Sequence, residues 1–142
     1  LNLQLVGGYL DRLEFVATPG AAPNSERGQP YSPEYVANFD AVWNRGPLTV
    51  AYGIQWFSET DRFTAETLAG DPDYAARRYL KIKAKWEHDL NVGYDVNDRF
   101  NVYAGVNNLF DEQPVFDFSS YPVSAMGRYF YAGARMNFGG SR

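Results

Sequence analysis

The sequence predicts an all-β protein, a section of an antiparallel transmembrane β-barrel, and three observations support this. Apolar and polar residues alternate along six segments, and the connections between them run long, short, long, short, long. No stretch approaches the roughly 18–20 apolar residues that a membrane helix needs. Alternation with a period of two is typical of strands with two unlike faces, and a barrel wall has an apolar lipid face and a polar lumenal face.

The composition agrees with strands and excludes several classes of protein. Of the 142 residues, 17% are aromatic and 13 are glycine, a mixture that favours strands and turns. The net charge of −4 argues against a nucleic-acid partner, which requires a basic surplus. The sequence contains no cysteine, so it has neither a disulfide framework nor a thiolate zinc site.

The six alternating segments can be followed in chain order, and the fourth is the clearest. They cover residues 1–16, 34–44, 48–58, 79–96, 100–110 and 128–138. In the fourth, one parity is apolar and comprises Leu80, Ile82, Ala84, Trp86, Leu90, Val92, Tyr94 and Val96. His88 interrupts that parity, which we interpret as a local bulge or a position near the membrane interface.

The alternation also predicts which side chains point to lipid and which to the lumen. The outward set is Leu80, Ile82, Ala84, Val92, Phe130, Ala132 and Met136. The inward set is Lys83, Lys85, Asn91, Tyr103, Tyr131 and Arg135.

The connections differ in length in a regular way. Residues 44–47 and 97–98 form tight turns, whereas 17–33, 59–78 and 111–127 are long and rich in Pro, Gly and Asp, with one helical turn expected at 64–68. Transmembrane barrels have short periplasmic turns and long extracellular loops. We therefore expect all three long connections at one end of the sheet and both tight turns at the other.

Six strands are too few to close the usual barrel. Single-chain outer-membrane barrels begin at eight strands, and an open edge in lipid leaves backbone groups unsatisfied at several kcal/mol each. The sequence therefore predicts a portion of a larger wall, in which both edge strands pair with strands of a missing segment.

Two motifs near the end of the chain resemble those of a known family. The segment Gly-Val-Asn-Asn-Leu-Phe-Asp-Glu-Gln-Pro, residues 105–114, resembles the penultimate-strand motif of TonB-dependent outer-membrane receptors. Residues 127–138 resemble their closing strand, and the signal read by the barrel-assembly machinery is similar to the set Tyr131, Gly133, Met136 and Phe138. Pro33 with Asn38 resembles the start of an earlier strand of that barrel.

The resemblance implies both a fold and a function. Residues 1–138 would be the last six strands of a 22-strand barrel, and 139–142 a tail, either vector-derived or a natural extension. Such receptors lie in the bacterial outer membrane and import a scarce nutrient (a siderophore, a vitamin or an oligosaccharide). The implied partners are the preceding strands and plug of the same receptor, the TonB complex through that plug, the barrel-assembly machinery, outer-membrane lipid and the nutrient.

Enzymatic chemistry is not expected. His88 is the single histidine, and neither a nucleophile motif nor a phosphate loop is present. No cofactor or metal is predicted, because the acidic pairs Asp71/Asp73 and Asp111/Glu112 read more simply as solvated turn residues than as calcium ligands.

Two sets of residues are candidates for binding the nutrient. Lys81, Lys83 and Lys85 could attract an anionic substrate in the lumen, or simply form charge pairs with Glu87 and Asp89. The second set could stack on a sugar or a chelate, or pack the loop bases; it comprises Tyr31, Phe63, Tyr74, Phe116, Phe118 and Tyr121.

One alternative function remains open at this point. A soluble β-sandwich or barrel that binds a ligand, such as a lectin-like module, would also show alternating strands. It would bury its apolar face against a second sheet, whereas a membrane wall would leave that face uncovered by protein.

Overall fold

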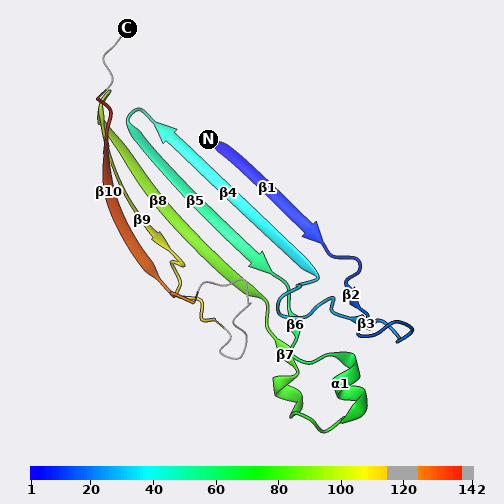
Figure 1. The fold of residues 1–142 in the computed structure, drawn as a ribbon. Coiled ribbons are helices and arrows are strands. Elements are labelled where there is room, and N and C mark those ends of the chain that lie inside the picture. Colours follow the sequence, from blue (N-terminus) through cyan, green and yellow to red (C-terminus); the bar gives the residue numbers. More distant parts are fainter. Residues whose placement is uncertain (115–124, 139–142) are drawn as a thin grey trace.

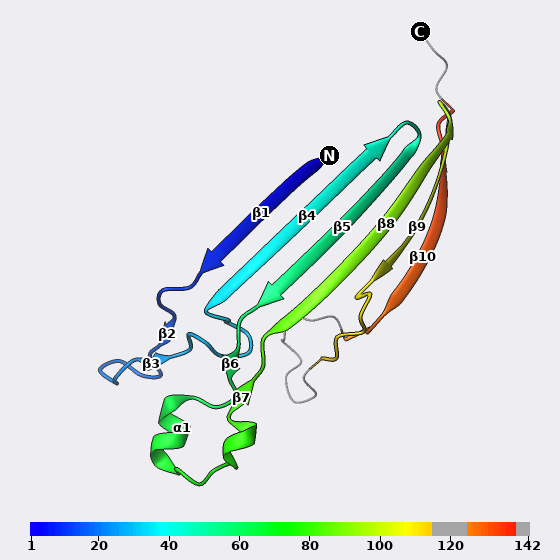
Figure 2. The same cartoon turned by 180° about the vertical axis from the view of Figure 1, so that it is seen from behind.

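The computed structural model describes residues 1–114 and 125–138 and contains one large antiparallel sheet of six strands in the order β1-β4-β5-β8-β9-β10 (Figures 1 and 2). The sheet strands are β1 (Asn2–Tyr9), β4 (Tyr35–Arg45), β5 (Leu48–Phe57), β8 (Lys85–Asn97), β9 (Phe100–Asn107) and β10 (Tyr129–Met136). The other elements are β2 (Glu14–Phe15), β3 (Asn24–Ser25), β6 (Thr60–Asp61), α1 (Ala65–Gly70), the 3₁₀ helix η1 (Arg77–Tyr79) and β7 (Lys81–Ile82).

The long connections all leave the same end of this sheet, as predicted. Because every neighbouring pair of sheet strands is antiparallel and follows chain order, the connections must alternate between the two ends. The β2–β3 hairpin, the segment with α1, and the ends of the β9–β10 connection lie at one end, opposite the two tight turns (Figure 1). The expected helical turn is α1, capped by the Thr64 hydroxyl, which accepts from Thr67 N at 3.3 Å.

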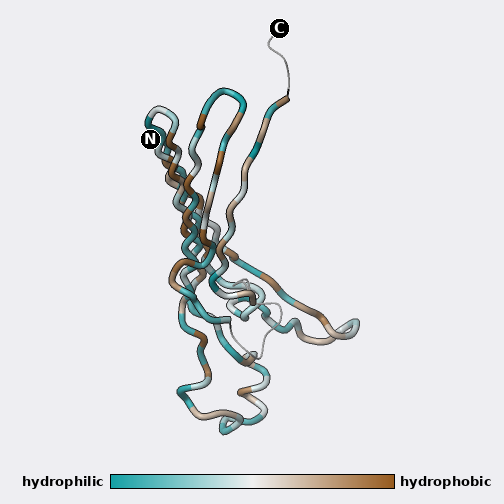
Figure 3. Tube along the Cα trace, turned by 90° about the vertical axis from the view of Figure 1, so that its left-hand side faces the viewer, coloured by the Kyte–Doolittle hydropathy of each residue, from teal (hydrophilic) through white to brown (hydrophobic). Residues whose placement is uncertain are grey.

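Strand register sorts the side chains onto one apolar and one polar face, because directly opposed residues point to the same side. One row across the sheet is wholly apolar; it comprises Leu3, Ala41, Tyr52, Leu90, Val106 and Phe130. The row displaced by one residue is mostly polar or small; it comprises Gln4, Asp40, Gly53 and Asp89. Hydropathy accordingly changes from residue to residue along the strands (Figure 3).

The two tight turns follow from their sequences. Gly46 adopts φ 57°, the left-handed region that glycine occupies without steric cost. In the second turn, Asn97 Oδ1 accepts hydrogen bonds from the backbone N–H groups of Arg99 (3.0 Å) and Phe100 (3.1 Å), an Asx turn. A bulge between Asp95 and Asn97 precedes it.

The apolar face carries no second layer of protein within the described residues. The other sheets there are two pairs of two-residue strands. Leu5 and Phe130 are 73% and 69% exposed, and Ile82 and Val106 are the buried hydrophobic residues of the described chain. The described residues therefore do not form a β-sandwich, because that fold requires a second sheet on this face.

The predicted fourth strand is too long at its start. It begins at Lys85, because residues 77–82 instead form η1 and β7, and β7 pairs with β6. Ile82 is 4% exposed in this small sheet, so the assignment of Leu80, Ile82 and Ala84 to an outward strand face was wrong.

Two other predicted strands also end early. The first sheet strand ends at Tyr9 and the fifth at Asn107. Asn108 and Asp111 have φ values of 52° and 58°, which take the backbone out of the extended region after β9.

Candidate functional site

On the polar face of the sheet, two tyrosine–glycine pairs lie between β9 and β10. Tyr131 lies opposite Gly105, and Tyr103 lies opposite Gly133. A Cβ atom on Gly105 would come 2.4 Å from the Tyr131 ring, and one on Gly133 would come 2.5 Å from the Tyr103 ring. Each tyrosine therefore occupies space that only glycine leaves free, and Asn91 Nδ2 donates to Tyr131 Oη at 3.0 Å.

Asn108 organises the base of the last long connection. Its side chain is 1% exposed; Nδ2 donates to Glu112 O (2.9 Å) and Oδ1 accepts from Glu112 N (2.7 Å). Its backbone N–H donates to Asp89 Oδ1 at 2.9 Å, which ties the connection to β8. Asp111 Oδ1 accepts from Arg128 N at 3.0 Å and so joins the two ends of the connection.

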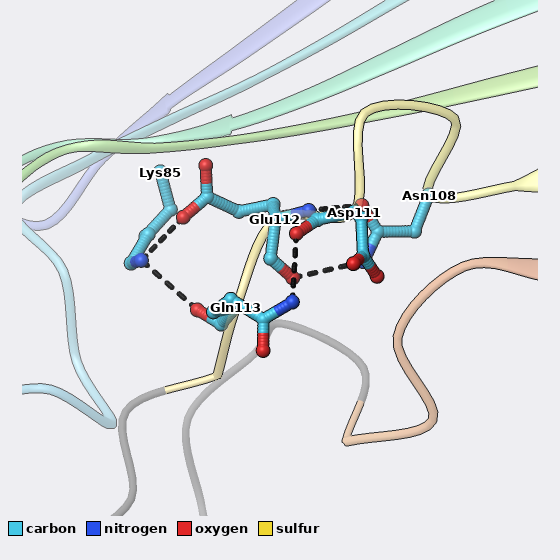
Figure 4. Close-up of polar contacts among 5 residues, drawn as sticks. All are labelled: Lys85, Asn108, Asp111, Glu112 and Gln113. Atoms are coloured by element: carbon cyan, nitrogen blue, oxygen red, sulfur yellow. Dashed lines mark hydrogen bonds and ion pairs between the residues drawn. The ribbon is translucent and has the colours of Figure 1, made fainter.

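A charged contact extends this base toward the start of β8. Lys85 Nζ forms an ion pair with Glu112 and donates to Gln113 O at 2.9 Å (Figure 4). Lys85 thus neutralises a loop carboxylate, and of the three lysines in the predicted ladder it is the one that belongs to the large sheet, at the first position of β8.

The first two long connections meet in a second polar cluster. Arg27 pairs with Glu34, donates to Tyr9 Oη at 3.1 Å, and lies 5.3 Å from the centre of the Tyr9 ring. The hydrogen bond to Glu34 raises the pKa of Arg27. Asp61 N donates to Gly28 O at 2.7 Å, which links the two connections through the backbone.

Lys81 belongs to this second cluster rather than to the lumenal face of a strand. Its Nζ lies 2.6 Å from Asp61 Oδ1 and 3.9 Å from Glu59 Oε1. The hydrogen bond to Asp61 raises the pKa of Lys81. Lys83 is exposed between β7 and β8. The continuous ladder of three lysines on one strand face was therefore wrong, because only Lys85 is in β8.

A hollow of about 220 Å³ opens between these two connections. We call it the loop hollow; its lining residues are Ser25, Arg27, Gln29, Asp61, Phe63, Ala65 and Leu68. Gln29 is 6% exposed, and its Nε2 donates to Phe63 O at 3.5 Å. Polar groups of four kinds and one aromatic ring therefore converge on a small space.

The structure brings together some of the predicted loop aromatics. The rings of Phe63 and Tyr74 meet edge to face with centroids 5.0 Å apart, whereas Tyr31 is 49% exposed in the first connection. Phe116, Phe118 and Tyr121 lie outside the described residues, as does the 139–142 tail. In the predicted assembly signal, Tyr131 and Gly133 form the pairs described above, Met136 ends β10 and Phe138 is 89% exposed.

His88 is accommodated on the apolar face without a bulge. It pairs regularly with Ile54 in the ladder, and its Nδ1 lies 2.7 Å from Tyr52 Oη. Phe110 covers its ring edge to face at 4.8 Å. The bulge interpretation was wrong, and a partner hydroxyl explains how an imidazole is tolerated here.

Sequence reasoning missed Arg27 and Gln29. Both lie in a segment of Gly, Gln and Pro that looks like ordinary loop. Their partners are Tyr9 at the end of β1, Glu34 in the same connection and Phe63 in the second connection. In the sequence, the only indication of this cluster is that Arg27 and Glu34 carry opposite charges and lie seven residues apart. The position of Asp61 beside them is seen only in the fold.

The described helices and acidic groups add two negative findings. No helix in residues 1–114 or 125–138 is both long and apolar enough to cross a membrane. In the same part of the chain, no three His, Cys, Asp or Glu residues gather in a way that could hold a metal ion.

A single twisted antiparallel layer, apolar on one face and polar on the other, with long loops at one end, defines a section of barrel wall. Comparison with family models agrees: the model described as "TonB dependent receptor-like, beta-barrel" matches residues 1–109. The chain belongs to this family, whose members are outer-membrane receptors rather than enzymes.

A solved structure shows the same fold. The ferric-catecholate import receptor Fiu from Escherichia coli K12, in its closed form, superposes with a TM-score of 0.52 at 19% sequence identity. The match covers 96% of this chain and 19% of that receptor, so the chain spans about a fifth of the receptor's length. A search among curated proteins finds no match.

Proposed function

We propose that this chain forms the last six strands of a 22-strand outer-membrane barrel, together with three extracellular loops of a receptor that imports a scarce nutrient. The apolar face would contact lipid, and the polar face would line the lumen around the plug. The observation that carries the proposal is the single layer with all three long connections at one end.

Aromatic residues on the apolar face support the membrane position. At the loop end, Tyr9 pairs with Tyr35 and Trp56 with Trp86, with ring centroids 5.0 and 5.9 Å apart. At the turn end of the same face lie Trp43 and Tyr94. Two aromatic rows flanking an aliphatic band are typical of a barrel wall at its two lipid–water interfaces.

The unpaired edges of β1 and β10 support the incomplete barrel. In the sheet each has one neighbour, β4 and β9 respectively. Exposed backbone donors and acceptors in lipid cost several kcal/mol each, so we propose that β1 pairs with a preceding strand and β10 with the opening strand of the barrel.

The nutrient class is proposed as a siderophore, because the structural neighbour is a ferric-catecholate import receptor. The partners would be the plug, the TonB complex, the barrel-assembly machinery and outer-membrane lipid.

The decisive experiment is pairwise cysteine cross-linking in cells that express the complete receptor. One cysteine would replace Val6 in β1 or Arg135 in β10, and the other would be scanned along the preceding or the opening strand. We expect disulfides at one register for each edge in outer-membrane fractions, and nutrient uptake that stops when the TonB complex is deleted. A chain that fractionates as a soluble monomer would overturn the proposal.

A further inference from the structure

The loop hollow has the chemistry of a binding site that the proposed function does not use. It lies where the first and second long connections meet, and it is framed by Arg27 and Gln29 on one side and by Asp61 and Phe63 on the other. Its volume of about 220 Å³ is below the range of drug-sized pockets, which begin near 300 Å³, and suits a single ring.

Two polar atoms at the hollow lack protein partners. Arg27 Nε is buried and makes no hydrogen bond. Gln29 is more than nine-tenths buried, and the single hydrogen bond of its side chain to the described residues uses the amide nitrogen, which leaves Oε1 available as an acceptor. A buried unpartnered donor and an unpartnered acceptor in one small space indicate a ligand that both donates and accepts hydrogen bonds.

The charges at the hollow are already compensated. Arg27 is paired with Glu34, and Asp61 is paired with Lys81. Because neither charge is left over for a ligand, an ion would gain little and would have to be desolvated. The site therefore favours a neutral polar molecule over an anion.

The Phe63 ring supplies an apolar surface beside these polar groups. Tyr74 contacts it edge to face at 5.0 Å, which fixes its orientation. A pyranose has an apolar face of C–H groups and a rim of hydroxyls that donate and accept, so its two kinds of surface match the two sides of the hollow.

We propose that the loop hollow binds one neutral hexose unit, stacked on Phe63 and hydrogen-bonded by Arg27 and Gln29. The proposal rests on the extracellular position of the loops, which is part of the proposed function. Arg27 also donates to Tyr9, a residue of the apolar face, so the hollow adjoins the rim of the lipid-facing wall. The hexose can come from a glycolipid headgroup in the outer leaflet or from a free saccharide.

The test uses the complete receptor in a detergent without a sugar headgroup. Methyl glucoside, methyl galactoside and methyl mannoside would be titrated by saturation-transfer NMR, with 2,3-dihydroxybenzoate as an anionic aromatic probe. We expect at least one hexoside to bind with Kd on the order of 1 mM, as a single ring allows, and the benzoate not to bind at this site.

Variants assign the binding to the hollow. Phe63→Leu keeps apolar volume but removes the ring, and Gln29→Leu removes the amide; each should weaken hexoside binding about fivefold or more. Phe63→Tyr should retain binding, and Tyr79→Leu, which removes an exposed aromatic outside the hollow, should leave it unchanged. Equal binding by wild type and Phe63→Leu, no hexoside signal at all, or benzoate binding in place of hexose would each overturn the proposal.

Two further measurements are needed. One distinguishes the two sources of the hexose, and the other distinguishes a failure of this inference from a failure of the proposed function. Tighter binding of a hexosylated lipid in nanodiscs than of the methyl hexoside would identify a glycolipid headgroup, and equal binding would identify a free saccharide. Membrane insertion and nutrient uptake are read independently, so a receptor that inserts and transports but binds no hexose contradicts this inference alone.

Discussion

The strand pairs at the two edges of the large sheet, β1–β4 and β9–β10, are held in register by different means. At the β9–β10 end, two tyrosines fill the spaces above two glycines of the opposite strand. At the β1–β4 end, Gly7 and Gly8 have no aromatic residue above them; a Cβ on Gly7 would approach Val36 O at 3.9 Å. Aromatic–glycine packing is thus found in the C-terminal hairpin, whereas the N-terminal edge has a tyrosine–tyrosine contact between Tyr9 and Tyr35 and a close approach of Val36 Cγ2 to Gly8.

The largest expected effect tests the apolar face, which both edges of the sheet share. A cation placed on the apolar face in mid-membrane should cost about 2–4 kcal/mol at either end. We therefore expect Ala132→Arg in β10 and Ala41→Arg in β4 to lower the urea midpoint of the folded receptor by similar amounts. Tyr131→Arg on the polar face should cost less than Ala132→Arg; equal losses would show that the apolar face does not meet lipid.

The next effect tests the glycine–tyrosine packing, in which the two edges of the sheet differ. Gly105→Ala should destabilise the receptor by about 1–3 kcal/mol, because the added methyl group displaces the Tyr131 ring. Gly7→Ala, on the apolar face at the other edge, is the control and should be nearly neutral, because the atom nearest to the added Cβ, its chain neighbours aside, is Val36 O at 3.9 Å.

A double variant sharpens this comparison. If the clash is the cause, Gly105→Ala combined with Tyr131→Ala should be less destabilising than the sum of the two single changes. Strict additivity in denaturant titrations would show that the aromatic–glycine pairing is incidental.

A smaller effect concerns the loop base beside the C-terminal hairpin. Asn108→Ala removes two buried hydrogen bonds to the Glu112 backbone and should cost about 1–2 kcal/mol. Asn44→Ala, which removes one exposed bond from Thr49 at the turn end, should cost less than half of that. The midpoint of thermal unfolding in detergent compares the two; an unchanged midpoint for Asn108→Ala would contradict the assigned role.

The smallest effect is a pH dependence in the loops at the N-terminal side. The pKa of Lys81 is raised in the folded state by its hydrogen bond to Asp61. A raised pKa means that the ion pair stabilises fully below the ordinary lysine pKa and that this contribution is lost as the pH rises through the raised value. Since both side chains are about half exposed, solvent screens most of it.

Lys81→Met provides the measurement for that last effect. Wild type and variant should differ slightly in unfolding midpoint near neutral pH and converge in strongly alkaline buffer. A difference that widens as the pH rises would reverse the assigned sign.

Sequence pattern predicted the sheet well and the loops poorly, for a physical reason. Alternation is imposed along every residue of a strand with two unlike faces, so β4, β5 and β10 were predicted to within one or two residues of their ends. Residues 79–84 also alternate, but Lys81 and Ile82 pair with β6 instead, and a local pattern cannot distinguish between two partner strands. The loop hollow was invisible for a similar reason, because Arg27 and Asp61 meet only after two connections fold together.

Alternation leaves one ambiguity that the tyrosine–glycine pairs remove. A shift of the strand register by one residue would turn every side chain to the wrong face. A shift by two residues keeps the apolar and polar side chains on their own faces. Moving β10 by two residues in one direction sets Tyr131 against Tyr103, and in the other it sets Gly133 against Gly105. Either shift separates both tyrosines from the glycines over which their rings now lie. The β9–β10 hairpin therefore fixes its own register by side-chain packing, independently of any partner at the other edge of β10.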